Sequence, residues 1–177
     1  YDDGDHIVAD VVRHPKTFAT DHHGPNEGPP TLDRWTIDLA AGKVLEERVD
    51  DRGQEFPRVD ERLVGRRHRY GYAAGFDADA GGAADVGMTD SVLKHDLVSG
   101  ATEVRTFGAG CGTGEFVFVP STPDAAEDEG VLLGYVYDPG PDRSALMVLD
   151  AATLETVAAV HLPVRVPYGF HGSWVAS

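Results

Sequence analysis

At 177 residues the chain is long enough for one ordinary domain with a sizeable core. An apolar fraction of 41% and a charged fraction of 25% are typical of globular proteins and exclude wholesale disorder. The formal net charge of −15 argues against nucleic acid or an anionic membrane surface as a partner, because both are bound through clustered lysine and arginine. The single cysteine, Cys111, excludes an internal disulfide, so a metal site would depend on histidine or carboxylate ligands.

The ends and the hydropathy of the chain suggest where it resides. No apolar run approaches the roughly 18 residues of a transmembrane helix, and residues 1–5, Tyr-Asp-Asp-Gly-Asp, do not resemble a signal peptide. We therefore expect a cytoplasmic protein. The chain begins without a methionine, which fits a segment that starts inside a longer chain.

Period-two alternation and turn residues dominate the pattern, which predicts strands and hairpins rather than helices. Segments 32–45, 91–104 and 146–157 each read as strand, tight turn and strand. The first strand of each hairpin ends in an aspartate that can accept hydrogen bonds from the turn amides. The hairpins recur at a period of 54 to 58 residues when they are aligned on these aspartates, Asp38, Asp96 and Asp150.

A second element recurs in step with the hairpins. Glu55-Phe-Pro-Arg-Val59 and Glu115-Phe-Val-Phe-Val119 share the pattern Glu-Phe-x-x-Val at a separation of 60 residues, and His171 stands 56 residues after Glu115. With one more strand candidate before each following hairpin, each period holds about four strands, as β-propeller blades do. If the three residues Glu55, Glu115 and His171 occupy successive innermost strands, they converge on the propeller axis. A chance match of short segments is the alternative.

The predicted fold is therefore all-β, with about three blades of a propeller. Three blades do not close a propeller, so a chain of this length standing alone would be a sandwich or an open array with exposed edges.

Three stretches of the chain resemble the carotenoid cleavage oxygenases, the family that includes lignostilbene dioxygenases and the isomerase of the retinal pigment epithelium. These stretches are 55–61 (Glu-Phe-Pro-Arg-Val-Asp-Glu), 114–133 with its Glu127-Asp-Glu-Gly130 segment, and 165–174 with its Phe170-His171-Gly172 motif. The resemblance covers nearly the whole chain in the expected order. It implies a seven-bladed propeller, of which residues 1–177 are the C-terminal portion of a single domain.

The resemblance also implies a metal site of iron(II), Fe2+, held by four histidines on the axis. His171 matches the last ligand, and Glu55 and Glu115 match two glutamates that accept hydrogen bonds from ligand imidazoles. Such an acceptor fixes the orientation of the ring and makes the imidazole more basic. The three further histidines are expected upstream of Tyr1, which matches the end of the family's Phe-His-His-x-Asn-x-Tyr stretch.

The activity that the resemblance implies is a dioxygenase reaction. Dioxygen adds across one carbon–carbon double bond of a carotenoid, apocarotenoid or stilbene and gives two carbonyl products. The partners would be this lipophilic conjugated substrate and O2, with transient membrane contact of the full-length protein where the substrate is delivered. We expect this chain to be inactive alone. Phe56, Phe116 and Phe170 flank the axial residues and are candidates for an apolar substrate tunnel, although ordinary core packing is the alternative for each.

Two other interpretations compete with this one. The chain could belong to a non-catalytic propeller that serves as a scaffold or binding module. A weaker alternative is a zinc hydrolase that uses Asp21, His22 and His23, but adjacent residues of an extended chain point in opposite directions. The remaining histidines, His6, His14, His95 and His161, are predicted to be surface groups.

Overall fold

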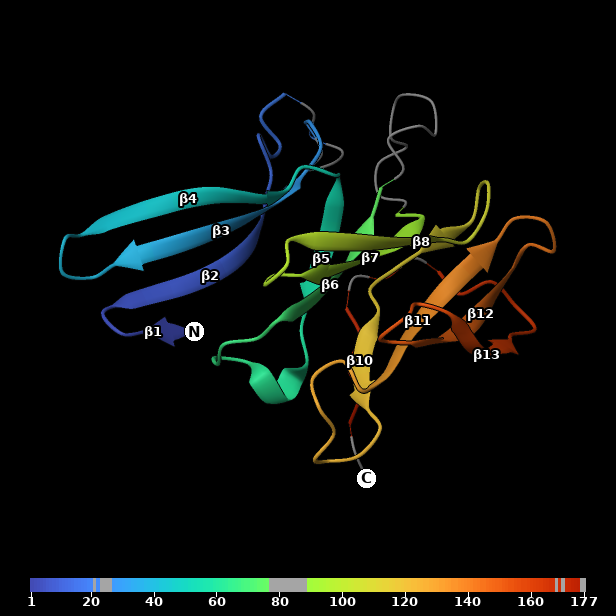
Figure 1. Cartoon of the computed structure of the whole chain (residues 1–177). Helices are drawn as coiled ribbons and strands as arrows, with labels where there is room; N and C mark the ends of the chain where they lie inside the picture. The colour runs from blue at the N-terminus through green and yellow to red at the C-terminus, as the bar shows by residue number, and fades with distance from the viewer. Residues whose placement is uncertain (21, 23–26, 77–88, 168, 170, 176–177) are drawn as a thin grey trace.

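The structure, a computed structural model, describes residues 1–20, 22, 27–76, 89–167, 169 and 171–175. In this part of the chain the regular elements are β-strands and one short 3-10 helix, η1 (Glu61–Leu63). No helix among these residues is long and apolar enough to cross a membrane. The strands that the structure describes form three antiparallel sheets, which follow one another in chain order (Figure 1).

Each sheet is a meander in which neighbouring strands pair in sequence order. The first sheet consists of β1 (Asp2–Asp3), β2 (His6–Arg13), β3 (Thr31–Asp38) and β4 (Lys43–Asp50). The second sheet consists of β5 (Gln54–Arg58), β6 (Tyr70–Gly75), β7 (Ser91–Asp96) and β8 (Ala101–Thr106). The third sheet consists of β10 (Val117–Pro120), β11 (Gly130–Asp138), β12 (Arg143–Asp150) and β13 (Thr156–His161), with β9 (Gly112–Thr113) paired to β11.

The three predicted hairpins are confirmed, and their turns are built as the sequence suggests. Strands β3, β7 and β12 each end at the expected aspartate. The Oδ1 atom of Asp38 accepts the N–H of Ala41 at 2.8 Å. Asp96 and Asp150 each accept two turn amides at distances between 2.9 and 3.2 Å. The aspartate thus satisfies turn amides that would otherwise lack a partner, and this fixes the position of the turn.

The main hydrophobic core lies between the second and third sheets. Tyr72 of β6 stacks on Phe118 of β10, with parallel rings whose centroids are 6.1 Å apart. Leu132 of β11 and Leu149 of β12 are fully buried. Packing here is tight enough that a Cβ atom on Gly134 would lie 2.5 Å from the ring of Phe116. These contacts hold the third sheet firmly against the second.

The junction between the first and second sheets is more polar. The buried side chain of His95 hydrogen-bonds Gln54 at 2.8 Å and the hydroxyl of Thr102 at 2.9 Å. Thr102 in turn donates to Asp50, at the end of the first sheet, at 3.0 Å. The prediction that His95 is a surface group is therefore wrong, because strands β5 and β8 supply partners that make burial of its ring tolerable.

The expectation of three successive innermost strands needs correction. Glu55 lies within β5, but Glu115 precedes β10 by two residues, and His171 lies outside any strand that the structure describes. The 56-residue spacing nevertheless brings Glu115 and His171 together, as the side-chain contacts show.

Candidate functional site

The contact between Glu115 and His171 is the centre of the candidate site. The Nδ1 atom of His171 lies 2.8 Å from Oε2 of Glu115, and the N–H of Gly172 donates to Oε1 at 3.2 Å. The side chain of Glu115 is only 3% exposed, whereas that of His171 is 71% exposed. Because an ionised carboxylate only accepts hydrogen bonds, Nδ1 carries the proton, and in the neutral imidazole Nε2 then has the lone pair. This is the orientation that a metal-binding imidazole requires.

Two residues of β5 contact the same segment. Phe56 meets the imidazole of His171 edge to face, with ring centroids 5.6 Å apart. Arg58 lies 3.3 Å from Oε1 of Glu115 through its Nη1 atom, and its Nη2 atom donates to the carbonyl of Gly172 at 3.3 Å. The pairing of β5 with β6 is irregular between Glu55 and Arg58, and both the Phe56 and the Arg58 side chains reach the His171–Gly172 segment.

Glu55, the other predicted glutamate, has a different partner. Its Oε1 atom accepts a hydrogen bond from Nε2 of His14, and its Oε2 atom accepts the N–H of Phe56 at 3.1 Å. His14 follows β2 directly and its side chain is 17% exposed, so it is half-buried rather than the surface group that the sequence suggested. The structure therefore pairs Glu115 with His171 and Glu55 with His14.

The three predicted tunnel residues are placed differently. Phe56 lies against His171, as described above. Phe116 is 4% exposed and belongs to the core cluster, where it stacks on Phe107. This placement fits core packing, the alternative considered for Phe116. Phe170 lies outside the described residues, as do Asp21 and His23 of the hypothetical zinc site. The tunnel assignment stays a prediction.

Among the described residues, His171 is suited to be one ligand of a metal site that has further ligands. In the described ranges, no group of three or more histidine, cysteine, aspartate or glutamate side chains could hold a metal ion. His171 offers one exposed imidazole whose Nδ1 atom is held by a buried carboxylate, and its Nε2 atom has no hydrogen-bond partner among the described residues. The residues present therefore fit iron as a single contributed ligand, and the other ligands would have to come from elsewhere.

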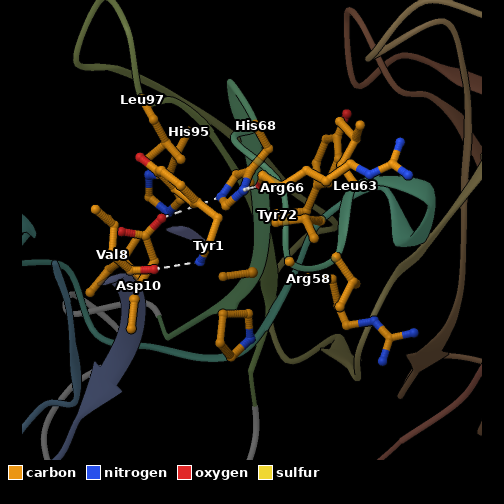
Figure 2. Close-up of a pocket in the computed structure, with 18 of the residues that line it drawn as sticks. Tyr1, Val8, Asp10, Arg58, Leu63, Arg66, His68, Tyr72, His95 and Leu97 are labelled. Carbon is orange, nitrogen blue, oxygen red and sulfur yellow. Dashed lines mark hydrogen bonds and ion pairs between the residues drawn. The ribbon is translucent and has the colours of Figure 1, made fainter. Parts of the chain in front are cut away.

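A cavity of about 340 Å³ opens between the first and second sheets (Figure 2). Its lining is mostly apolar, and Asp10 and His68 face each other on one wall. Arg58 lines the opposite wall, with its guanidinium group directed away from that pair (Figure 2). The cavity thus shares one residue, Arg58, with the surroundings of His171.

Asp10 and His68 form an ion pair that the sequence did not reveal. Nε2 of His68 lies 3.3 Å from Oδ2 of Asp10, and Arg34 binds the same carboxylate through two N–H groups at 2.7 and 2.9 Å. Burial opposes ionisation of Asp10, but the hydrogen bonds from His68 and Arg34 prevail and lower its pKa to about 2. The same hydrogen bond raises the pKa of His68 above 6.5, against the effect of burial.

Comparison with known proteins agrees with this architecture. The family model described as retinal pigment epithelial membrane protein matches residues 1–176. A carotenoid cleavage oxygenase of Mycobacterium tuberculosis is 46% identical over 169 residues, covering 95% of this chain and 34% of the relative. The apocarotenoid-15,15'-oxygenase of Synechocystis is 38% identical over 151 residues, covering 84% of this chain and 30% of the relative. This chain therefore spans about a third of the length of the curated relatives it matches.

A solved structure gives the same result for the fold. The crystal structure of cobalt-substituted Synechocystis apocarotenoid oxygenase superimposes with a TM-score of 0.89 at 32% identity, covering all of this chain and 38% of that chain. The chain is all-β, and its three described sheets are blades of a propeller. The chain belongs to the carotenoid cleavage oxygenase family, and the resemblance identified in its motifs is confirmed.

Proposed function

We propose that residues 1–177 are the C-terminal portion of a single propeller domain in a non-haem iron(II) dioxygenase. The reaction would split one carbon–carbon double bond of a carotenoid, apocarotenoid or stilbene into two carbonyl products. The observation that carries the proposal is the buried carboxylate of Glu115 on Nδ1 of His171, which leaves Nε2 free. The names of two relatives, a carotenoid cleavage oxygenase and an apocarotenoid oxygenase, support the substrate class.

The chain's own residues would orient and shield the site. Glu115 holds the ring of His171 in one orientation and makes the imidazole a stronger donor. Phe56 packs on the edge of the same ring and adds an apolar surface where a conjugated hydrocarbon could lie. Glu55 would accept a hydrogen bond from a second ligand histidine, in the position that His14 takes in this structure.

The metal would complete the chemistry. When bound, iron(II) activates dioxygen so that each of the two carbonyl products receives one oxygen atom. Four neutral imidazoles leave the full positive charge on the metal, which suits dioxygen chemistry at iron. Three of these histidines would come from a part of the protein upstream of Tyr1. A cytoplasmic location of the whole protein stays a prediction.

The test uses the full-length gene product and the variant His171→Ala. We expect loss of cleavage of a carotenoid or stilbene substrate, measured by carbonyl product formation, together with loss of stoichiometric iron. His161→Ala, an exposed histidine at the end of β13, is the matched control and should keep both. Full activity in the His171→Ala protein would reject the proposed role of His171. A wild-type protein without iron and without cleavage would instead favour the non-catalytic scaffold.

A further inference from the structure

The segment that carries His171 is held by very few groups. Residues 171–175 form no strand, and their side chains are exposed. Among the described residues, the contacts that fasten the segment include those of Glu115 with Nδ1 of His171 and the N–H of Gly172, that of Arg58 with the carbonyl of Gly172, and the edge-to-face contact of Phe56 with the His171 ring. An exposed segment without strand pairing gains its position from such specific contacts. Glu115, which lies just before β10, and Phe56 and Arg58 of β5 therefore position the His171–Gly172 segment.

Arg58 contacts both the carboxylate of Glu115 and the backbone of Gly172. One nitrogen of its guanidinium lies 3.3 Å from the carboxylate of Glu115, and the other donates to the carbonyl of Gly172 at the same distance. The fork of N–H groups on an arginine is suited to such a double contact, which a single ammonium group cannot reproduce. Arg58 thus ties the carboxylate that orients His171 to the backbone directly after it.

The charge of Arg58 matters as well as its shape. The side chain of Glu115 is 3% exposed, and a carboxylate so far removed from water is costly unless a positive charge or several hydrogen bonds compensate it. A neutral imidazole and one backbone amide supply hydrogen bonds but no charge. Arg58 supplies the positive charge, with its own side chain 22% exposed. Loss of this charge would leave a buried anion paired only with a neutral ring.

The local backbone explains why Arg58 can reach this position. The pairing of β5 with β6 is irregular between Glu55 and Arg58, and Phe56 adopts a φ of 55°. A bulge of this kind bends a strand and redirects the side chains that follow it. Glu61, three residues beyond Arg58, accepts a hydrogen bond from the same Nη2 atom and holds the guanidinium from the other side. The side chain is thus directed toward the third sheet rather than along the cavity wall.

We propose that Arg58 is a positioning residue for the metal site, which acts by fixing the Glu115–His171 pair and the Gly172 backbone. This inference rests on the proposed function, because it assigns Arg58 to the His171 ligand. The contacts of Arg58 are with Glu115, the carbonyl of Gly172 and Glu61, so its proposed action on the metal is indirect. Its expected contribution is the orientation of one ligand, and positions of this kind typically change metal affinity by about 10- to 100-fold.

The experiment uses the full-length protein in its metal-free form, with Co2+ as the probe. The variants are Arg58→Gln, which removes the charge, and Arg58→Lys, which keeps the charge but not the fork. Arg62→Gln is the matched control, because Arg62 is four residues away in the same region and binds Asp60 and the carbonyl of Pro123 instead. Co2+ affinity is measured by chelator competition, and the proton on Nδ1 of His171 by NMR of labelled histidine, assigned with His171→Ala.

Arg58→Gln should weaken Co2+ binding by about 10-fold or more and reduce the fraction of His171 protonated at Nδ1. For both quantities, Arg58→Lys should give values between those of Arg58→Gln and the wild type. Arg62→Gln should give the wild-type values. Because a purely structural role would change unfolding without changing the His171 tautomer, the NMR signal separates the two roles. If Arg58→Gln does not fold, the Co2+ affinity and the His171 tautomer of Arg58→Lys are compared with those of Arg62→Gln to test the inference.

Two outcomes are distinguishable. If His171→Ala loses Co2+ but both Arg58 variants keep the wild-type affinity and His171 tautomer, the inference about Arg58 is overturned and the proposed function stands. If His171→Ala binds Co2+ as the wild type does, the proposed function fails, and the assignment of Arg58 to that ligand fails with it.

Discussion

The two junctions between neighbouring sheets differ in character although the sequence repeats at a nearly constant period. Between the second and third sheets, aromatic and aliphatic side chains such as Tyr72, Phe118 and Leu132 are closely packed. Between the first and second sheets, polar contacts predominate, including the ion pair of Asp10 and His68, and a cavity of about 340 Å³ remains. The tightly packed junction is the one that carries Glu115. If Glu115 orients a metal ligand as proposed, this carboxylate lies beside the more tightly packed junction, as precise positioning requires.

The largest effect that separates the junctions is expected from matched leucine truncations. Leu132→Ala in the apolar junction should lower the free energy of unfolding by about 4 kcal/mol, because a fully buried side chain leaves a cavity that its neighbours cannot fill. Leu32→Ala, beside the existing cavity of the polar junction, should cost only about 2 kcal/mol. Denaturant unfolding of both variants measures the difference. Equal losses, or a larger loss at Leu32, would show that the two junctions are equally well packed.

A smaller effect is expected from pH at the polar junction. The pKa of Asp10 is lowered to about 2, so its stabilising contribution is complete above about pH 4 and is lost as the pH falls toward 2. The pKa of His68 is raised above 6.5, so its contribution is complete below pH 6.5 and is lost as the pH rises through its folded-state pKa. The pair therefore stabilises the fold most between about pH 4 and pH 6.5.

Asp10→Asn tests this pair. We expect it to remove about 1 to 2 kcal/mol at pH 5, after allowance for partial exposure of the pair, and to flatten the pH profile of unfolding on both sides of that window. Glu103→Gln, an exposed carboxylate on β8, should leave the profile unchanged. If Asp10→Asn kept the wild-type pH profile, the ion pair would not contribute to the stability of this junction.

The smallest effect is expected at the buried hydrogen-bond chain of the same junction. Thr102→Val keeps the shape of the side chain but removes the hydroxyl that joins His95 to Asp50. We expect a loss of about 1 kcal/mol, since Nδ1 of the buried His95 and Oδ2 of Asp50 each lose the hydroxyl as a partner. Thermal unfolding would detect this change, with Thr106→Val at the exposed end of β8 as the control. No loss at Thr102 would mean that water replaces the hydroxyl.

The sequence predicts the hairpins and the family well because those signals are local. The aspartates Asp38, Asp96 and Asp150 fix their turns through hydrogen bonds to amides two or three residues away. The spacing predicted that Glu55, Glu115 and His171 converge on one axis; the structure brings Glu115 and His171 into contact, although neither lies in a described strand.

The features that escaped prediction depend on contacts between distant segments. His95 stands at the end of a strand among polar residues, and only the approach of Gln54 and Thr102 allows its burial. Lys94, with a side chain 4% exposed, is likewise buried against Asp128, which lies 34 residues later. The contact of Arg58 with Gly172 also escaped prediction, because the two residues lie 114 positions apart.

The central claim is that the Nε2 atom of His171 binds the iron of the active site, with Glu115 behind it. The most direct measurement is anomalous X-ray diffraction at the iron edge from crystals of the iron-loaded full-length protein. The account predicts an anomalous peak about 2 Å from Nε2 of His171, with Nδ1 still on the carboxylate of Glu115. A peak remote from His171, or an Nε2 atom packed against hydrocarbon with no metal beside it, would contradict the account.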